Sequence, residues 1–198
     1  MNKYLQSCKT EFWKKVFKAE LNYLLQELEG DKDILSVGCG PAIIEAGLAE
    51  HGFNVIGLDI SKEALDQAPD SIRTVVGSAE NMDFEEASFD AVIYIASLQF
   101  IEKYKEAICK TANVLKSDGK LVAILLNPDS EFFKEKMKKP DSYLNKIKHT
   151  NLKEIEKSIA EYFSVQNEYF LGIKGQDIFE TKNPNLASLY VIKGIKKQ

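Results

Sequence analysis

The chain has 198 residues, of which 44% are hydrophobic and 28% charged, and its net charge is −4. This length corresponds to one domain, and the apolar fraction excludes an intrinsically disordered chain. The negative charge argues against a general nucleic-acid binder, and no apolar run approaches the ~18 residues of a membrane span. Cys8, Cys39 and Cys109 fit neither a disulfide framework nor a CxxC metal site. With a polar N-terminus that lacks the apolar stretch of a signal peptide, these features predict a cytoplasmic protein.

An amphipathic helix is predicted over residues 4–28, because apolar residues recur there every three or four positions. Gly30 follows as a plausible stop. The ring of Tyr4 or Trp13 could close a ligand pocket beneath this helix. Packing of the same helix against the core explains both side chains equally well.

Strands and helices alternate from residue 34 onwards. The predicted strands cover residues 34–37, 54–59, 73–80, 89–97 and 120–126. Helices are predicted over residues 41–51, from Ser61, and over residues 103–116. Short apolar runs between helices are typical of strands that are buried on both faces of a parallel sheet. The pattern therefore predicts a doubly wound α/β sheet.

The pattern changes after Asn127-Pro128. Helices are predicted over residues 130–139 and 151–162, followed by strands over residues 164–173 and 186–195. The polar loop between these two strands suits an antiparallel return. We expect one domain over residues 1–198, with a cap at 1–29, a cofactor-binding core at 30–127, a helical insertion or lid at 127–163 and a terminal strand pair at 164–198.

Two glycines stand between the first predicted strand and the following helix, in the run Val37-Gly38-Cys39-Gly40. Glycine lets the backbone turn sharply and lets a ligand approach without a Cβ in the way. The helix N-terminus adds free N–H groups and a partial positive charge. A GxG pattern alone is a weak signal, but its position between strand and helix makes it a candidate cofactor loop.

Asp59 closes the second predicted strand, 19 residues beyond Gly40. A carboxylate at this strand tip can accept hydrogen bonds from two ribose hydroxyls, although it could also simply start the helix at Ser61. Both features occur in folds that bind NAD and in folds that bind S-adenosylmethionine. A dinucleotide site calls for a third glycine at position 43, where this chain has Ile43, so the residues favour S-adenosylmethionine.

Three stretches within residues 30–127 resemble the class I S-adenosylmethionine-dependent methyltransferases: ILSVGCGPAIIEAGLAEHGFNVIGLDIS, GSAENMDFEEASFDAVIYIASLQFI and VLKSDGKLVAI. The resemblance implies a Rossmann-like sheet of seven strands with helices on both faces. It implies the strand order 3-2-1-4-5-7-6, with the last strand antiparallel, which the final strand pair fits. It also implies S-adenosylmethionine as the cofactor.

The resemblance implies a cofactor site from residues that match the family pattern. They are Val37, Gly38, Cys39, Gly40, Asp59, Ile60, Ala79, Glu80, Tyr94, Ile95 and Ala96. By this resemblance Asp59 would hold the ribose, Ile60 would lie against the adenine, and main-chain carbonyls from Tyr94 onwards would face the cofactor's amino group.

Several positions depart from the family pattern. Ser36 and Ser78 stand where many relatives have an acidic residue, and Ala42 replaces a frequent glycine. Gln99 and Phe100 lie near the position of a histidine pair that many relatives carry.

Methyl transfer from a sulfonium is an in-line displacement, in which the protein mainly supplies alignment and desolvation. Candidate bases are His149, Asp129 and Tyr143, and the sequence singles out none of them. We predict methyl transfer to a small-molecule acceptor, with no metal site and with neither membrane nor nucleic acid as partner. The oligomeric state stays open. An NAD-dependent oxidoreductase, or a non-catalytic cofactor- or partner-binding module, remains an alternative.

Overall fold

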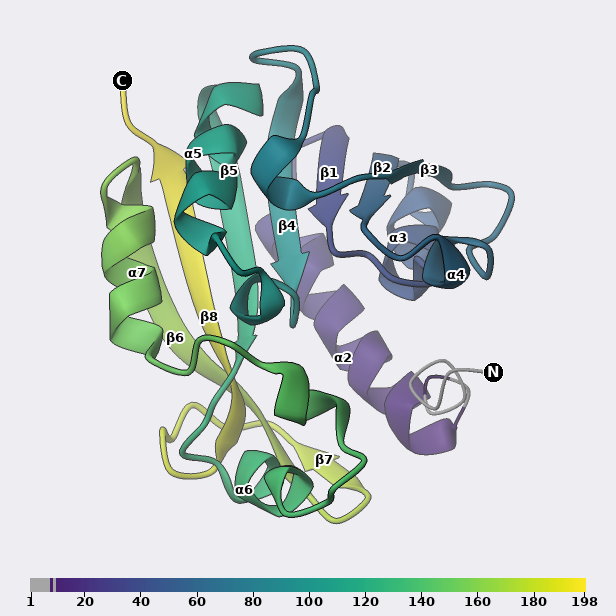
Figure 1. Ribbon diagram of the computed structural model, residues 1–198, viewed down its shortest axis with the longest axis vertical. Helices are drawn as coiled ribbons and strands as arrows, with labels where there is room; N and C mark the ends of the chain where they lie inside the picture. The colour runs from purple at the N-terminus through teal and green to yellow at the C-terminus, as the bar shows by residue number, and fades with distance from the viewer. Residues whose placement is uncertain (1–7, 9) are drawn as a thin grey trace.

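A mixed sheet of eight strands forms the centre of the computed structural model, which describes residue 8 and residues 10–198 (Figure 1). The strands are β1 Asp33–Val37, β2 Asn54–Asp59, β3 Arg73–Val76, β4 Phe89–Ile95, β5 Leu115–Leu126, β6 Phe163–Lys174, β7 Asp177–Phe179 and β8 Ala187–Lys196. Their order across the sheet is β3-β2-β1-β4-β5-β8-β6-β7. β1 to β5 pair in parallel, and β8 runs antiparallel between β5 and β6.

The predicted order of seven strands and the antiparallel last strand are confirmed, but the predicted strand count is wrong. The extra strand, β7, pairs with the end of β6 and forms the edge of the sheet. It has three residues and follows a turn at Gly175, whose φ is +62°. Such a short strand inside a polar loop leaves no periodic pattern in the sequence.

Helices cover both faces of the sheet, as predicted (Figure 1). The helices are α2 Glu11–Glu27, α3 Ile43–Glu50, α4 Lys62–Leu65, α5 Tyr104–Val114, α6 Glu131–Met137 and α7 Leu152–Ala160, with 3₁₀ turns η1 Ala79–Asn81, η2 Leu98–Phe100 and η3 Tyr143–Lys146. Buried residues of α5 and α7 share one core cluster, and those of α2, α3 and α6 share the other.

The central strands divide their side chains between these two cores. In β1, Leu35 packs on the side of α5, whereas its neighbour Ile34 packs on the side of α2 and α3. In β4, Val92 and Ile93 alternate in the same way. Successive strand residues point to opposite faces of a sheet, so a strand covered on both faces is apolar throughout.

Some element ends differ from the sequence prediction. Residues 4–7 and 9 of the predicted first helix, including Tyr4, lie outside the described residues. The helix after β1 begins at Ile43 rather than at Pro41, because Ala42 adopts a left-handed conformation with φ +54°. Ala42 thus takes a conformation that favours glycine, the residue it replaces in the family pattern. Among the described helices, none is both long and apolar enough to cross a membrane.

Candidate functional site

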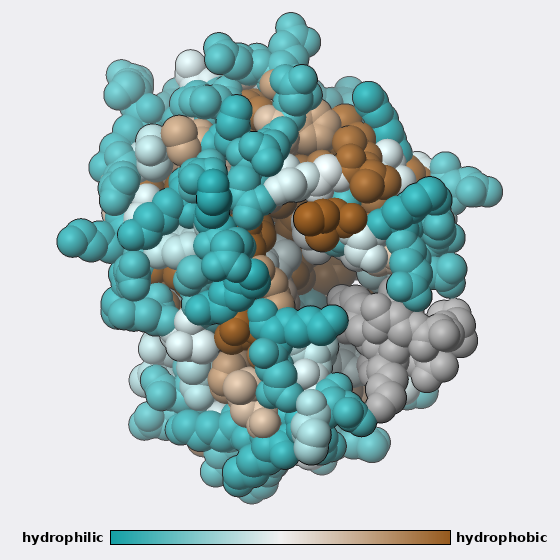
Figure 2. Space-filling model, in the orientation of Figure 1, coloured by the Kyte–Doolittle hydropathy of each residue, from teal (hydrophilic) through white to brown (hydrophobic). Residues whose placement is uncertain are grey.

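Two adjoining cavities lie at the carboxyl ends of β1, β2 and β4. The outer cleft, of about 500 Å³, runs from Asp59 and Ile60 past Gly38 to η3. The inner cavity, of about 70 Å³, lies beneath α2 and α6. The two cavities share the residues Gly38, Ile95, Ala96 and Tyr143. In Figure 2 this face of the molecule has a hollow with hydrophobic side chains on its rim.

The glycine loop after β1 forms the floor between the two cavities. Gly38 has φ +75°, and its N–H donates a hydrogen bond of 2.7 Å to the carbonyl of Leu58. A Cβ at Gly38 would lie 2.5 Å from the Cβ of Ser97, so any larger residue would meet the β4 tip. Gly40 also has a positive φ, of +55°. The backbone of this loop therefore needs glycine at both positions.

Cys39 points away from the outer cleft and lines the inner cavity. Its Sγ packs against β2, where a Cβ on Gly57 would lie 2.6 Å from it. Burial raises the pKa of the Cys39 thiol well above its usual range, so the thiol stays protonated. Cys39 therefore fills space in the loop, and a nucleophilic role does not fit its surroundings.

Asp59 links the loops that follow β1 and β2. Its Oδ2 accepts a hydrogen bond of 2.8 Å from the N–H of Gly40, and its Oδ1 accepts one of 2.8 Å from the N–H of Ser61. Ser61 itself caps α4 through its hydroxyl, which accepts from the N–H of Ala64 at 3.2 Å. A carboxylate has about four acceptor sites, so Asp59, which lines the outer cleft, retains capacity for two hydroxyl donors.

The far end of the outer cleft is lined by Ile60 and by η1. The side chain of Ile60 is 76% exposed, which leaves a flat apolar surface beside the cleft. Glu80 accepts hydrogen bonds from the hydroxyl of Ser78 and from the N–H of Lys103. The hydrogen bond from Ser78 is the main reason that the pKa of Glu80 lies below its ordinary value. The Glu80 carboxyl group is thus ionised, and part of its hydrogen-bond acceptor capacity is already used by donors from the protein.

Most of the predicted cofactor residues come together at the outer cleft. Those that line it are Val37, Gly38, Gly40, Asp59, Ile60, Ala79, Glu80, Ile95 and Ala96. Tyr94 lines neither cavity. Its side chain is fully buried on the α5 side of the sheet, and its hydroxyl forms a hydrogen bond of 2.7 Å with the hydroxyl of Thr111. Alternation along β4 places Tyr94 on the opposite face from its neighbours.

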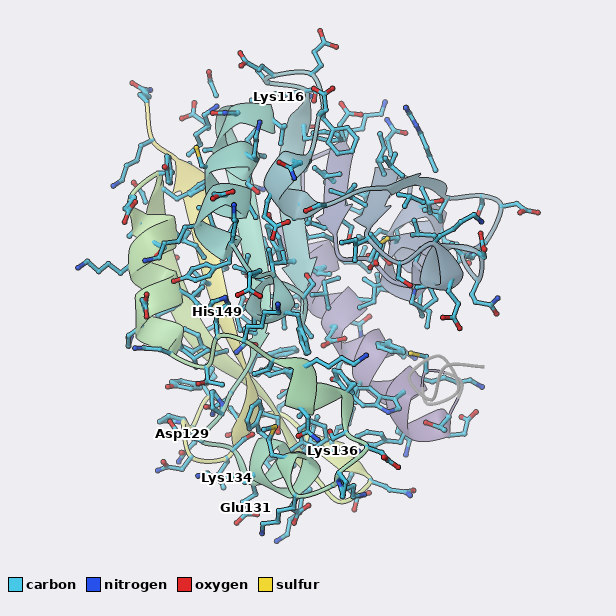
Figure 3. The ribbon with its side chains drawn as sticks, in the orientation of Figure 1. Lys116, Asp129, Glu131, Lys134, Lys136 and His149 are labelled. Carbon is cyan, nitrogen blue, oxygen red and sulfur yellow. The ribbon has the colours of Figure 1, made fainter. Side chains whose placement is uncertain are left out.

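Two of the three candidate bases lie away from both cavities. Nε2 of His149 lies 3.0 Å from the carbonyl oxygen of Ile101, and Gln99 holds the His149 backbone. Asp129 lines neither cavity, and Figure 3 shows it beside α6 together with Glu131 and Lys134. In this structure the His149 ring contacts the backbone of the loop that contains Ile101, and Asp129 is an exposed surface residue.

Tyr143 lines both cavities and stacks on Phe100, with ring centroids 5.8 Å apart. Burial raises the pKa of its phenol far above the usual value, with a smaller contribution from Glu20. Its hydroxyl therefore keeps its proton, and Tyr143 can donate a hydrogen bond but does not suit the role of a base.

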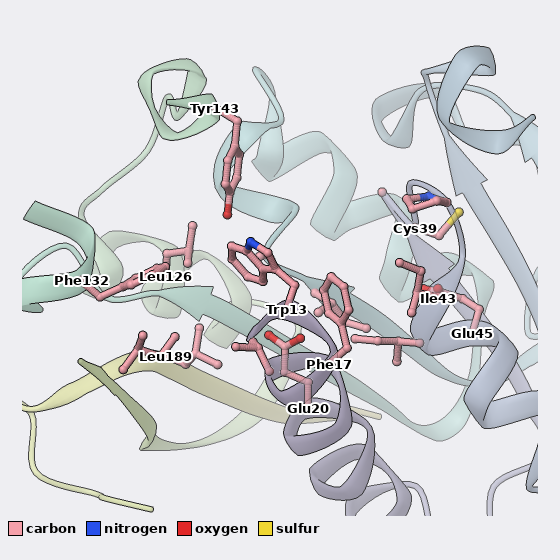
Figure 4. Close-up of a pocket in the computed structure, with 17 residues that line it drawn as sticks. Trp13, Phe17, Glu20, Cys39, Ile43, Glu45, Leu126, Phe132, Tyr143 and Leu189 are labelled. Atoms are coloured by element: carbon pink, nitrogen blue, oxygen red, sulfur yellow. The ribbon is translucent and has the colours of Figure 1, made fainter. Parts of the chain in front are cut away.

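The sequence analysis missed two carboxyl groups in the inner cavity, Glu20 from α2 and Glu45 from α3 (Figure 4). Burial raises the pKa of Glu20 to about 8, with Glu45 as the second cause. Burial also raises the pKa of Glu45 to about 7, against a hydrogen bond from Ser36 that lowers it. Within the described residues, no group of three or more His, Cys, Asp or Glu side chains has a metal-binding arrangement.

Glu20 did leave a signal in the sequence. It lies in a helical row with Val16, Leu24 and Leu28, each four residues from the next, and all four side chains are buried. A single acidic residue inside an apolar row is the pattern that marks a functional carboxyl group, because burial of a charged side chain is otherwise unfavourable.

Comparison with known proteins agrees with this geometry. A family profile described as a methyltransferase domain matches residues 35–123, from β1 into β5. An uncharacterized protein of Methanocaldococcus jannaschii is 31% identical over 111 residues, covering 56% of this chain and 49% of that protein. The chain thus spans about half the length of this relative. A ubiquinone biosynthesis O-methyltransferase of Vibrio campbellii is 26% identical over 182 residues, with 77% of each chain covered.

The whole fold has a close structural counterpart. The crystal structure of a SAM-dependent methyltransferase of Thermotoga maritima, described as a possible histamine N-methyltransferase, matches with a TM-score of 0.82. The match covers 99% of this chain and 95% of that one, at 18% sequence identity. At this identity the likeness concerns the fold.

Proposed function

We propose that this chain, whose residues 35–123 match a methyltransferase domain, uses S-adenosylmethionine to transfer a methyl group to a small-molecule acceptor by in-line displacement. The observation that supports this proposal is that the outer cleft and the inner cavity adjoin and share Gly38, Ile95, Ala96 and Tyr143 in their walls. An in-line displacement needs donor and acceptor on opposite sides of the methyl carbon, and two adjoining cavities would offer one compartment to each.

The residues of the outer cleft fit S-adenosylmethionine. The outer cleft has a volume of about 500 Å³, which lies in the range of pockets that hold small ligands and cofactors. Asp59 would accept the ribose hydroxyls, Ile60 and Ala79 would contact the adenine, and the glycine loop would pass beneath the rest of the molecule. When bound, this cofactor supplies a methyl group that is already activated on a positively charged sulfur.

We further propose that two segments outside the cofactor core shape the acceptor site, namely the cap over residues 1–29 and the insertion over residues 127–163. Trp13 and Phe17 reach the inner cavity from α2, and Phe132 reaches it from α6. The small volume and the enclosed position of this cavity suit a small acceptor better than a macromolecule. The cap and the insertion would exclude water from the reacting groups, and the reaction would take place in the cytoplasm.

A labelling experiment tests the acceptor class. The protein is incubated with S-adenosylmethionine carrying a radioactive methyl group and with a cell extract that is divided by dialysis. We expect the label to appear in the dialysable fraction. Label in the retained protein or nucleic-acid fraction would contradict a small-molecule acceptor, and label in neither fraction would favour a binding module without activity.

A further inference from the structure

The inner cavity contains two buried carboxyl groups, and none of the described residues that line it has a cationic side chain. Glu20 is 4% exposed and Glu45 is 2% exposed. Glu45 accepts a hydrogen bond from the hydroxyl of Ser36 at 2.5 Å. The carboxyl group of Glu20 has no hydrogen bond or ion pair with any of the described residues. No described residue in the wall of the cavity therefore supplies a positive charge to pair with these carboxyl groups when they ionise.

Folding alone does not explain an acidic side chain at position 20. A buried polar group without a partner costs about 1–3 kcal/mol, and a buried charge costs more. The neighbours of Glu20 in its helical row, Val16 and Leu24, are apolar and buried, so a leucine would suit this position. The carboxyl group instead faces a cavity, which indicates a ligand that supplies the missing hydrogen-bond donors.

Aromatic rings complete the wall around these carboxyl groups (Figure 4). Trp13 stacks on Phe17 with ring centroids 5.8 Å apart and meets Phe132 edge-on at 6.3 Å. The ammonium of Lys136 already lies 6.0 Å from the Trp13 ring centroid and 5.4 Å from that of Phe132. These rings are thus placed to attract a cation, and aromatic faces beside a carboxylate are the combination that recognises ammonium groups.

We propose that the inner cavity binds an ammonium group of a ligand, held by the carboxyl group of Glu20 and by the surrounding aromatic rings, with Glu45 as a second carboxyl group. The inference rests on the proposed function, because the ammonium has two sources there. One is the aminoacyl end of the cofactor, and the other is an amine acceptor.

For an amine acceptor, Glu20 has a defined role in the chemistry. In its ionised form, the Glu20 carboxyl group takes one proton from the ammonium, which leaves a neutral amine with a free electron pair and a protonated carboxyl group. The amine nitrogen then bonds to the methyl carbon as the carbon–sulfur bond breaks, and the bonding pair stays on the sulfur. The positive charge passes from sulfur to the methylated nitrogen, and S-adenosylhomocysteine leaves as a neutral thioether.

The test uses the fluorescence of Trp13, which is the only tryptophan of the chain and lines the inner cavity. One arm titrates the protein with S-adenosylhomocysteine and with 5′-methylthioadenosine, which lacks the aminoacyl group. The other arm titrates protein that is saturated with S-adenosylhomocysteine, using phenethylamine and its neutral counterpart phenethyl alcohol. Each titration is repeated with Glu20→Gln, which removes the ionisable carboxyl group with little change in shape.

At least a tenfold loss of S-adenosylhomocysteine affinity in Glu20→Gln, with methylthioadenosine unaffected, assigns the site to the cofactor's own ammonium. A tenfold loss of phenethylamine affinity alone assigns it to an amine acceptor. Equal S-adenosylhomocysteine affinities, together with no preference for phenethylamine over the alcohol in the wild-type protein, overturn the proposal.

Two controls separate this proposal from the proposed function. Glu50→Gln makes the same charge change on an exposed side chain of α3 and should leave all affinities unchanged. If the wild-type protein binds neither nucleoside, the proposed function fails. The amine and alcohol titrations of the ligand-free protein then test the ammonium site alone, and equal binding of the two would overturn it.

Discussion

The hydroxyl of Ser36 donates a hydrogen bond of 2.5 Å to Oε1 of Glu45, and both side chains are buried. This pair joins the end of β1 to α3 beneath the glycine loop. The carboxyl group beside the end of β1 thus comes from α3. This carboxyl group lies in the wall of the inner cavity.

The buried carboxyl groups predict a falling stability between pH 5 and 8. The pKa values of Glu20 and Glu45 are raised from 4.5 to about 8 and about 7. Above pH 4.5 the unfolded chain loses these protons while the folded chain keeps them, so ionisation favours unfolding. Each carboxyl group lowers the free energy of unfolding by ~1.4 kcal/mol per pH unit until the pH passes its folded pKa. Above pH 8 both carboxyl groups are ionised in the folded and in the unfolded chain, so their effect on the free energy of unfolding no longer changes with pH.

Urea denaturation at several pH values measures this slope. Glu20→Gln should remove about half of the slope that the two carboxyl groups contribute between pH 5 and 7, because the contribution of Glu45 remains. Asp59 also raises the pKa of Glu45 and remains in the variant. The exposed control Glu50→Gln should follow the wild-type curve. A Glu20→Gln protein with an unchanged slope would show that Glu20 is ionised in the folded state.

Gly38→Ala should abolish cofactor binding. The new Cβ would lie 2.5 Å from that of Ser97, and the residue would keep a φ of +75° that costs an L-residue about 1–2 kcal/mol. Gly30 offers a matched control, because its φ is +88° and a Cβ there meets nothing within 4 Å. Gly30→Ala should lose only the conformational energy and bind S-adenosylhomocysteine as the wild type does. Equal affinities of the two variants would argue against the close approach at Gly38.

Gln99 should be a structural residue that connects the β4 tip to the insertion. Its amide nitrogen donates to the carbonyls of Leu126 and His149, and its amide oxygen accepts the N–H of Leu126 at 2.7 Å. Gln99→Leu leaves these buried groups without partners and should cost about 2–5 kcal/mol in the free energy of unfolding. It should also speed proteolysis of η3. Asn145→Ala, which removes exposed hydrogen bonds, should cost less than about 0.5 kcal/mol. Similar losses in both variants would refute this assignment.

The sheet could be predicted from the sequence because its strands are short apolar runs between helical segments. Residues such as Leu35 and Val92 are buried on faces that differ from those of their neighbours, which produces these runs. The position of Asp59 at the tip of β2 followed from the same pattern. The strand β7 could not be predicted, because Phe179 gains its place through a tertiary contact with Gly172.

The inner cavity was beyond the sequence prediction for a related reason. Glu20, Glu45 and Phe132 come from three helices that the sequence does not place relative to one another. Periodicity assigns α2 an apolar face, but only the packing of that face shows that Glu20 opens into a cavity. The contacts of the His149 ring with the backbone carbonyl oxygens of Ile101 and Glu102 likewise depend on the fold and could not be read from the sequence.

Calorimetric titration with S-adenosylhomocysteine, S-adenosylmethionine and NAD, on the wild type and on Asp59→Ala, tests the central claim most directly. Asp59 holds Gly40 and Ser61 through its two oxygens and lines the outer cleft. We expect micromolar binding of both sulfur ligands, at least a tenfold loss in Asp59→Ala, and no heat with NAD. Wild-type protein that binds NAD but neither sulfur ligand would contradict the assignment of this cleft to S-adenosylmethionine.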